Sequence, residues 1–324
     1  MKPRALVTKK LSEKHKAYLN TYCNCEFLDQ EVLSRHELLA KVADVEGLLQ
    51  VGHIIDEELL SKAPNLKIVS NVSVGYNNFD VEAMKKYGVL GTNTPGVLDD
   101  TVADLVFGLI LNVARRLSEL DRYVKEGQWK PSDLEELFGT DVHHKTLGII
   151  GLGRIGQKIA KRAALGFDMQ VSYYNRSRNR EAEEAYGAIY KSMEDILTDS
   201  DFIILMVPLT EETKNLMTLE AFKSMKSSAI FINASRGATV DEAALFEAVN
   251  TGIIKGAGLD VFVDEPVASD NFLLSHPRIV TLPHIGSATH ATRELMAKLA
   301  CENFVMGIKG EMPPCVIPEL KVLI

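Results

Sequence analysis

Short apolar runs alternate with charged, amphipathic stretches along the first third of the chain. Apolar runs of strand length lie at 5–8, 25–28, 47–51 and 68–72, and helical patterns lie between them at 11–22, 31–42 and 56–63. Strands separated by helical segments of this length pair in parallel, because a crossover returns the chain to the edge where the previous strand began. This part of the chain therefore predicts a small parallel sheet covered by helices on both faces.

A second series of apolar runs follows a turn-rich break at 93–96. Residues 101–126 have a helical period with few breakers and predict one long helix that crosses to the next region. The apolar runs at 147–150, 169–174, 202–207, 229–233, 257–261 and 279–282 predict a second parallel sheet. The tail opens with a helical pattern to about 308 and is too short for a domain, so we expect it to pack onto the first sheet.

The length of the chain agrees with this division, since 324 residues exceed the size at which one core keeps growing. We expect an α/β protein with two Rossmann-like or flavodoxin-like doubly wound parallel-sheet domains and a cleft between the domains. The first domain is expected at 1–99, completed by 288–324, and the second at 100–287.

Composition changes this picture little but argues against several classes of protein. A net charge of −8 and an isoelectric point near 5.6 argue against nucleic-acid binding. Lys9 and Lys10 interrupt the first apolar run before a signal-peptide core could form, and no run reaches membrane-spanning length. The four cysteines form neither a CxxC pair nor a metal-ligand spacing with histidine. We therefore expect reduced thiols, no metal site, no membrane partner and a cytoplasmic location.

The strongest motif is a glycine-rich turn between a predicted strand and a predicted helix. Residues 146–156 read Thr-Leu-Gly-Ile-Ile-Gly-Leu-Gly-Arg-Ile-Gly, and an alanine-rich helical pattern follows to about 164. Gly151 permits the tight turn, Gly153 leaves room for a pyrophosphate, and Gly156 lets the helix pack on the sheet. The helix N-terminus then faces the anion. The pattern predicts a dinucleotide site, and the alternative is a tight strand-to-helix turn without a ligand.

The end of the next strand predicts which dinucleotide is bound. Proteins specific for NAD carry Asp or Glu about 20 residues beyond the glycine turn. This chain has Asn175-Arg176-Ser177-Arg178 at that position. Two guanidinium groups and a hydroxyl suit a 2′-phosphate, and the turn has no carboxylate to repel it. We expect NADP to be preferred, with NAD as a second cofactor, and the alternative is a solvated basic turn.

Three side chains of different chemistry follow three successive strands of the second sheet. Arg236, Glu265 and His284 each come shortly after an apolar run, at the edge where parallel sheets bind ligands. An arginine fork can hold the carboxylate of a 2-oxo acid, while an imidazolium protonates its carbonyl oxygen as hydride arrives at carbon. A carboxylate beside the imidazole orients the ring and favours its protonated form. Taken singly, the three could be an ion-pair arginine, a turn carboxylate and a capped loop histidine.

At these positions the chain resembles the D-isomer-specific 2-hydroxyacid dehydrogenase family, over almost its whole length. The resemblance rests on the ordered motifs at 151–156, 233–237, 258–266 and 282–289. It implies a substrate-binding first domain and an NAD(P)-binding second domain. It also implies Arg236 as substrate clamp, His284 as acid and base, and Glu265 as the partner of His284.

The resemblance implies further contacts of both ligands. The implied cofactor contacts outside the three glycines and the 175–178 turn are Thr101, Arg154, Ile155, Val207, Pro208, Thr213, Ala234, Ser235, Asp260 and Gly286. The implied substrate contacts are the backbone amides of Val74 and Gly75, with Arg236, His284 and Ser287. Simpler alternatives remain open, since Val74 could be strand core, Asp260 could fix only its own turn, and Thr101 could cap the crossing helix.

Within the family, the 175–178 turn and the His-Ile-Gly-Ser-Ala-Thr-His run at 284–290 are most similar to glyoxylate/hydroxypyruvate reductases, including 2-ketogluconate reductases. We expect a homodimeric enzyme that transfers hydride from NADPH to a small 2-oxo acid and gives the D-2-hydroxy acid. Trp129 lies where relatives reach a neighbouring subunit's active site, and it could instead simply pack at the dimer interface. The rival hypotheses are an NAD-dependent phosphoglycerate-type dehydrogenase and a non-enzymatic nucleotide-sensing corepressor.

Overall fold

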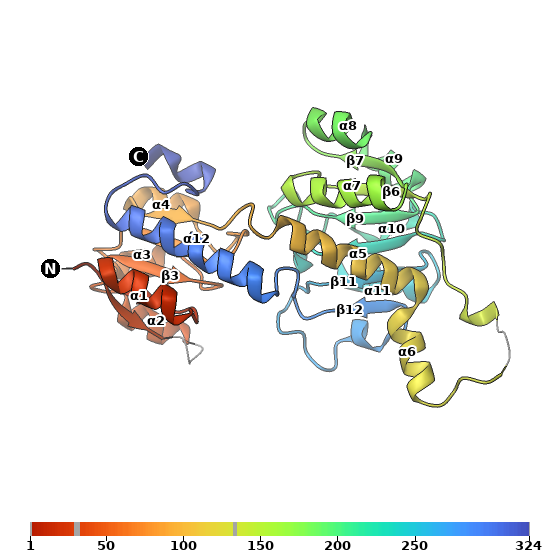
Figure 1. Cartoon of the computed structure of the whole chain (residues 1–324), viewed down its shortest axis with the longest axis horizontal. Coiled ribbons are helices and arrows are strands. Elements are labelled where there is room, and N and C mark those ends of the chain that lie inside the picture. The colour runs from red at the N-terminus through yellow and green to blue at the C-terminus, as the bar shows by residue number, and fades with distance from the viewer. Residues whose placement is uncertain (1, 29–32, 132–134, 324) are drawn as a thin grey trace. The chain divides into compact units, whose positions relative to one another are not determined.

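The chain folds into two compact units, each built on its own parallel sheet (Figure 1). The computed structural model describes residues 2–28, 33–131 and 135–323. The first unit comprises Met1–Leu98 and Ala288–Ile324, and the second comprises Asp99–Ser287. The predicted fold class, two doubly wound α/β domains, is confirmed. None of the described helices is long and apolar enough to cross a membrane.

The first unit contains a five-stranded parallel sheet in the order β2-β1-β3-β4-β5. This is the flavodoxin-like order, in which the chain reverses its direction of winding beside β1. Its strands are β1 (Arg4–Val7), β2 (Asn24–Phe27), β3 (Gly47–Gln50), β4 (Ile68–Asn71) and β5 (Leu90–Thr92). Its helices are α1 (Glu13–Tyr22), α2 (Arg35–Lys41), α3 (Glu57–Lys62), α4 (Val81–Tyr87), α12 (His290–Ile308) and the 3-10 helix η4 (Pro318–Leu323).

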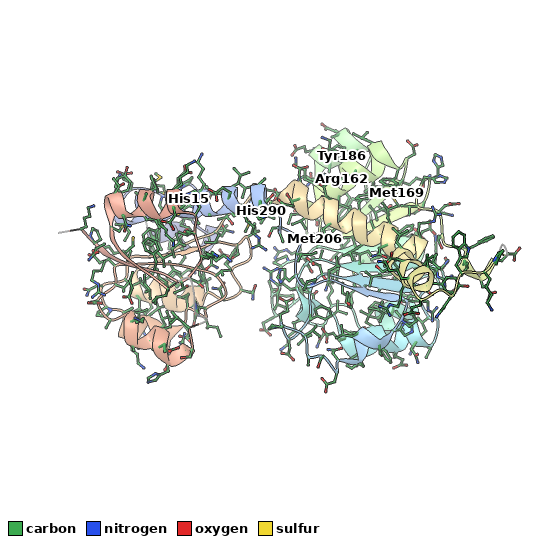
Figure 2. The ribbon with its side chains drawn as sticks, turned by 60° about the horizontal axis from the view of Figure 1, so that its bottom comes forward. His15, Arg162, Met169, Tyr186, Met206 and His290 are labelled. Carbon is green, nitrogen blue, oxygen red and sulfur yellow. The ribbon has the colours of Figure 1, made fainter. Side chains whose placement is uncertain are left out.

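Helices cover both faces of this sheet. On one face α2, α3, α4 and η4 share a buried apolar cluster with β1, β3 and β4. On the other face α12 lies along β3 and β4 beside α1 (Figure 1). The approach is close, because a Cβ added at Gly307 of α12 would lie 2.3 Å from the Ile68 side chain. His15 of α1, labelled in Figure 2, places its Nε2 2.8 Å from a carboxylate oxygen of Glu294 on α12.

The second unit contains a seven-stranded parallel sheet in the order β12-β11-β10-β9-β6-β7-β8. The winding reverses between β6 and β9, as in Rossmann folds, and β12 adds one strand to the six of that fold. Its strands are β6 (Thr146–Ile150), β7 (Gln170–Tyr174), β8 (Ile189–Tyr190), β9 (Phe202–Leu205), β10 (Ile230–Asn233), β11 (Gly256–Leu259) and β12 (Ile279–Thr281). Its helices are α5 (Asp99–Arg115), α6 (Leu117–Lys125), α7 (Arg154–Gly166), α8 (Arg180–Tyr186), α9 (Met193–Asp199), α10 (Leu219–Lys223) and α11 (Glu242–Asn250), with the 3-10 helices η1 (Glu135–Leu137), η2 (Gly237–Thr239) and η3 (Phe272–Ser275).

Two helices of the second unit, α5 and α7, lie side by side on one face of its sheet (Figure 1). Arg162 of α7, labelled in Figure 2, forms ion pairs with Asp100 and Asp104 of α5 at 3.1 and 2.7 Å. On the other face α9, α10 and α11 share one buried cluster with β9 and β10. Because all seven strands are parallel, the loops after β6, β10, β11 and β12 emerge at one edge of the sheet.

The expected single helix over 101–126 is wrong, because the chain breaks it into α5 and α6. Arg116 between them has φ 56°, in the left-handed region. The break is stabilised locally, since the Ser118 amide donates to Asn112 Oδ1 at 2.9 Å and Arg116 Nε donates to Glu119 at 2.9 Å. The helical period continues through the break, so the hydrophobic pattern holds no sign of it.

Smaller differences also separate the expected elements from the observed ones. The helix expected at 31–42 begins at Arg35, after the N-cap Ser34, and residues 31 and 32 lie outside the described residues. The strands β5 and β8 were not expected. β8 has only two residues, both exposed, and therefore gives no apolar run in the sequence.

Candidate active site

The glycine turn after β6 has the form that a dinucleotide phosphate requires. Gly151 has φ 104°, and a Cβ there would lie 2.4 Å from the carbonyl oxygen of Met206, a residue labelled in Figure 2. A Cβ at Gly156 would lie 2.5 Å from the Gly151 carbonyl oxygen, whereas one at Gly153 would meet nothing within 4 Å. Two glycines thus permit close packing, and Gly153 keeps open space at the start of α7.

The first turn of α7 carries no acidic side chain, and its N-cap Gly153 provides no side-chain acceptor. The amides at this helix end are therefore available to an anion, which fits the pyrophosphate of a dinucleotide. Arg154 follows the turn and pairs through Nε with the buried carboxylate of Asp99 at 3.3 Å. Ile155 and Thr101 are half-buried, and Thr101 lies on α5, the helix that packs against α7.

The turn after β7 lies against the glycine turn. The Asn175 side chain accepts a hydrogen bond from the Leu152 amide at 2.7 Å and donates to the Leu152 carbonyl at 3.3 Å. Asn175 thus ties the two turns together. Arg176, Ser177 and Arg178 are exposed beside it. Glu183 of α8, which no motif in the sequence marks, forms an ion pair with Arg178 at 2.7 Å.

Two further loops hold five of the expected cofactor residues. The hydroxyl groups of Thr213 and Ser235 form hydrogen bonds within these loops. Thr213 Oγ1 donates to the Pro208 carbonyl at 2.6 Å and accepts from the Thr210 amide at 2.8 Å. Ser235 Oγ donates to Asn233 Oδ1 at 2.7 Å. Val207 and Ala234 are half-buried, while Pro208 is exposed and Ser235 is buried.

Arg236 follows β10 in a turn that is held from several sides. Its carbonyl oxygen accepts hydrogen bonds from Asn233 Nδ2 at 3.0 Å and from Thr239 Oγ1 at 2.6 Å. The next residue must be glycine, because a Cβ at Gly237 would lie 1.8 Å from the backbone carbon of Phe262. This contact places the Arg236 turn against the loop that carries Glu265. Burial lowers the pKa of Arg236 and the Glu265 charge raises it, and an arginine remains protonated at physiological pH.

Glu265 and His284 are in direct contact, as the family resemblance implied. Nδ1 of His284 lies 2.6 Å from Oε2 of Glu265, and the Phe262 amide donates to Oε1 at 3.0 Å. Burial raises the pKa of Glu265, but the hydrogen bonds from His284 and Phe262 and the charges of His284 and Arg236 outweigh it and leave the pKa below its ordinary value. Glu265 therefore faces His284 as a carboxylate at neutral pH.

The loop that carries His284 is held in an uncommon conformation by Asp260. His284 has φ 51°, which costs a non-glycine residue roughly 1 kcal/mol and persists only where neighbours enforce it. The Asp260 carboxylate, at the end of β11, accepts from the amides of Ile285 at 2.7 Å and Gly286 at 2.8 Å. Burial raises the pKa of Asp260, and these two hydrogen bonds oppose the rise. Asp260 therefore fixes the loop after the next strand, not only its own turn.

The expected substrate contacts Val74 and Gly75 lie in the first unit, in the loop after β4. The Asn93 side chain donates to the Val74 carbonyl at 2.7 Å, and Ser73 Oγ donates to the Gly75 carbonyl at 2.7 Å. Within the described parts of the chain, no hydrogen bond uses the amide N–H of Val74 or Gly75. Both amides are therefore able to donate to a ligand. Ser287, half-buried, is the last residue of the second unit.

Three side chains of the second unit can together bind an organic anion and transfer a proton. Arg236, Glu265 and His284 follow β10, β11 and β12, which are neighbouring strands. A fixed cation can hold an organic anion, and an imidazole oriented by a carboxylate can exchange a proton with it. Among the described residues, no group of three or more His, Cys, Asp and Glu side chains could hold a metal ion.

Comparisons with known proteins show the family to which the chain belongs. The sequence model of the D-isomer specific 2-hydroxyacid dehydrogenase NAD binding domain matches residues 107–286. A glyoxylate/hydroxypyruvate reductase B of Klebsiella pneumoniae is 49% identical over 295 residues, which cover 91% of this chain and 91% of that protein. A glyoxylate reductase of Thermococcus litoralis is 46% identical over 320 residues, covering 97% of this chain and 96% of the relative.

A solved structure is similar over nearly the same extent. It is an NADPH-dependent glyoxylate/hydroxypyruvate reductase of Sinorhizobium meliloti in complex with NADP and malonate, with a TM-score of 0.86 and 31% sequence identity. The match covers 99% of this chain and 98% of that one. The family model covers more than half of the chain and the relatives are similar over most of it, so the chain belongs to the D-isomer specific 2-hydroxyacid dehydrogenase family.

Proposed function

We propose that this chain reduces glyoxylate, hydroxypyruvate or 2-ketogluconate to the D-2-hydroxy acid with hydride from NADPH. Family membership makes it an NAD(P)-dependent oxidoreductase acting on CH–OH groups. The main observation behind the proposal is the distance of 2.6 Å between His284 Nδ1 and Glu265 Oε2. Glu265 and His284 lie in loops after β11 and β12, and Arg236 follows β10, the strand next to β11. The bound nicotinamide supplies the hydride, and the side chains of this chain hold the acid and supply the proton.

His284 is the proposed proton donor in reduction. Its Nδ1 is held by Glu265, so Nε2 is the nitrogen left to face the carbonyl oxygen of the substrate. As hydride reaches carbon 2, the proton on Nε2 passes to the oxygen, and C=O becomes CH–OH. The ionised Glu265 orients the imidazole ring through its contact with Nδ1 both before and after this step. In the oxidative direction the neutral His284 accepts the same proton.

Arg236 is the proposed clamp for the substrate carboxylate. A guanidinium offers two parallel N–H donors, which match the two oxygens of a carboxylate and draw electron density from the neighbouring carbonyl. The backbone of Arg236 is fixed by Asn233 and Thr239, and its Nη1 donates to the Ser235 carbonyl at 2.6 Å, so the turn that carries the clamp is held without substrate. The uncommitted amides of Val74 and Gly75 and the hydroxyl of Ser287 are the proposed additional donors.

The cofactor preference rests on the turn after β7. Arg176, Ser177 and Arg178 are exposed there, and the position that carries Asp or Glu in NAD-specific folds holds Asn175, whose side chain is used by Leu152. A phosphate on the ribose therefore meets cations and a hydroxyl at this turn. The S. meliloti structure, similar over nearly the whole chain, is a complex with NADP. The other expected cofactor residues are proposed to line the same site.

The test is a matrix of initial rates at neutral pH. NADPH and NADH oxidation are followed with glyoxylate, hydroxypyruvate, 2-ketogluconate, pyruvate and 3-phosphohydroxypyruvate. We expect faster turnover with NADPH than with NADH on at least one of the first three acids. Turnover confined to 3-phosphohydroxypyruvate with NADH would favour a phosphoglycerate-type dehydrogenase. Cofactor binding without turnover of any acid would favour the nucleotide-sensing corepressor.

We also propose that the enzyme is a homodimer and works in the cytoplasm. α6 has no buried residue, and Leu117, Val124, Trp129 and Phe138 are at least half exposed on or after it. An apolar surface of this kind favours a protein partner, and a second copy of the chain is the proposed one. The four cysteines are free thiols, which suits a reducing compartment.

The dimer is tested by light scattering after size exclusion. Val124→Glu on α6 should give monomers, whereas Leu165→Glu, which alters another apolar side chain that is more than half exposed on α7, should leave the dimer intact. Trp129 is the single tryptophan of the chain, so its fluorescence reports directly on this surface. A monomeric wild-type protein would exclude the proposed assembly.

A further inference from the structure

Arg178 of the turn after β7 is already engaged by a carboxylate. Its Nε and Nη2 donate to the two oxygens of Glu183 at 3.0 and 2.7 Å, in the two-pronged geometry of strong arginine pairs. The Tyr173 hydroxyl donates to the same carboxylate at 2.6 Å. Tyr173 also accepts from the Asn179 amide at 2.7 Å, so the group that holds Glu183 is itself fixed. Glu183 is thus satisfied from two sides by residues of β7 and its following turn.

The Glu183–Arg178 pair is strongly held. The hydrogen bonds of Arg178 and Tyr173 lower the pKa of Glu183 to about 2, so the carboxylate is ionised at neutral pH. Its side chain is 17% exposed, whereas that of Arg178 is 61% exposed. Withdrawing Arg178 would leave a mostly covered carboxylate without its cation, which is unfavourable. Arg178 therefore stays with Glu183 unless a ligand offers a comparable anion.

Arg176 differs from Arg178 in this respect. It is exposed in the same turn, and in the described part of the chain no hydrogen bond or close ion pair engages its guanidinium, although its charge helps to lower the pKa of Glu212. The turn thus presents one guanidinium without a direct hydrogen bond to a carboxylate and one that is bound by Glu183 through two hydrogen bonds. The sequence does not distinguish the two arginines. The structure does, because it shows that Arg178 is paired with Glu183.

We propose that Glu183 sets how strongly this turn selects a nucleotide with a 2′-phosphate, because it competes with that phosphate for the Arg178 fork. The inference rests on the proposed NADPH preference and adds a positioning residue to it. With Glu183 in place, the phosphate is met mainly by Arg176 and the Ser177 hydroxyl. Without the carboxylate, Arg178 turns its fork to the phosphate, and selectivity for the phosphorylated nucleotide rises.

The test measures binding of two fragments that differ only in the 2′-phosphate. Dissociation constants for 2′,5′-ADP and 5′-AMP are measured by calorimetry on the full chain. Glu183→Gln should tighten 2′,5′-ADP binding by roughly three- to ten-fold and leave 5′-AMP binding unchanged. This is the effect expected when one partly screened charge, the Arg178 guanidinium, becomes available to a phosphate. Glu184→Gln is the matched control, because Glu184 is an exposed neighbour on the same helix and its removal changes the net charge equally.

A double variant separates positioning from simple repulsion. In the Arg178→Ala background, Glu183→Gln should give no gain, because the fork that it would release is absent. A gain that persists there would mean that the Glu183 charge repels the phosphate directly, which overturns the positioning role. Weaker 2′,5′-ADP binding by Glu183→Gln, or equal effects of Glu183→Gln and Glu184→Gln, would also overturn it.

The same data distinguish this inference from the proposed function on which it rests. If wild-type protein binds 2′,5′-ADP no better than 5′-AMP, the NADPH preference itself fails. If wild type shows the preference but Glu183→Gln does not change it, only the role of Glu183 fails. Unchanged 5′-AMP affinity verifies that each variant is folded. Glu183→Asp gives a second test in which the negative charge is retained, because the shorter side chain cannot make the two-pronged contact with Arg178.

Discussion

The Asp260 carboxylate holds the backbone of Gly286, with the Gly286 amide 2.8 Å from Oδ2. The other carboxylate oxygen accepts from the neighbouring Ile285 amide. These two bonds fix the loop in which His284 adopts a positive φ. The position of the proposed proton donor therefore depends on a side chain that directly follows the preceding strand, β11.

Asp260→Asn tests this relationship. An amide side chain keeps one oxygen acceptor, so one of the two loop amides loses its buried partner. We expect the free energy of unfolding to fall by about 1.5–3 kcal/mol, the usual size for a hydrogen bond to a charged group. We also expect kcat to fall more than the affinity for NADPH, because His284 loses its position while the glycine turn is untouched. Urea unfolding and steady-state rates measure the two effects, and an unchanged kcat would contradict the positioning role.

His284→Ala tests proton transfer itself. Removing the imidazole should lower kcat by about 10²-fold or more, the usual contribution of general acid catalysis. NADPH should still bind, which fluorescence titration measures. His143→Ala is the control, because the His143 side chain is 62% exposed and lies outside the site. Full turnover by the His284 variant would remove this residue from the mechanism.

Gly237→Ala tests the contact that places Arg236 beside Glu265. The added methyl carbon would lie 1.8 Å from the Phe262 backbone, so the turn and the loop must separate. We expect a loss of about 1–3 kcal/mol in unfolding free energy, as for other overpacked sites, with a marked fall in kcat/KM. Gly166→Ala at the end of α7 is the control, since its Cβ would meet nothing within 4 Å. Equal behaviour of the two variants would show that the approach at Gly237 is unimportant.

The Glu183–Arg178 pair predicts a specific dependence of stability on pH. The pKa of Glu183 is lowered from its ordinary value of 4.5 to about 2. The stability that the pair contributes is therefore complete above about pH 4.5 and is lost as the pH falls toward 2. Urea unfolding of wild type and Glu183→Gln should differ by a constant amount from pH 7 to 5. The difference should shrink below pH 4.5, and a difference that stays constant to pH 3 would contradict the assignment.

Much of the fold follows from local pattern. Apolar runs of four to six residues separated by helical stretches predict most of the observed strands, because a buried parallel strand must be apolar on both faces. Where the hydrophobic pattern failed to predict the observed elements, the reason is local. Arg116 breaks a helix through its own backbone conformation and side-chain contacts, and β8 is too short and exposed to leave an apolar run.

The sequence alone determined the glycine turn, the basic turn after β7 and the order of Arg236, Glu265 and His284. These features are local, or they follow from the rule that parallel strands end at one edge. Which side chains meet across strands and turns became known from the folded structure. Glu183 binds Arg178, Asp260 binds the His284 loop, and Gly237 touches Phe262. Such contacts depend on the packing distance between separate segments, and neither residue type nor spacing along the chain specifies that distance.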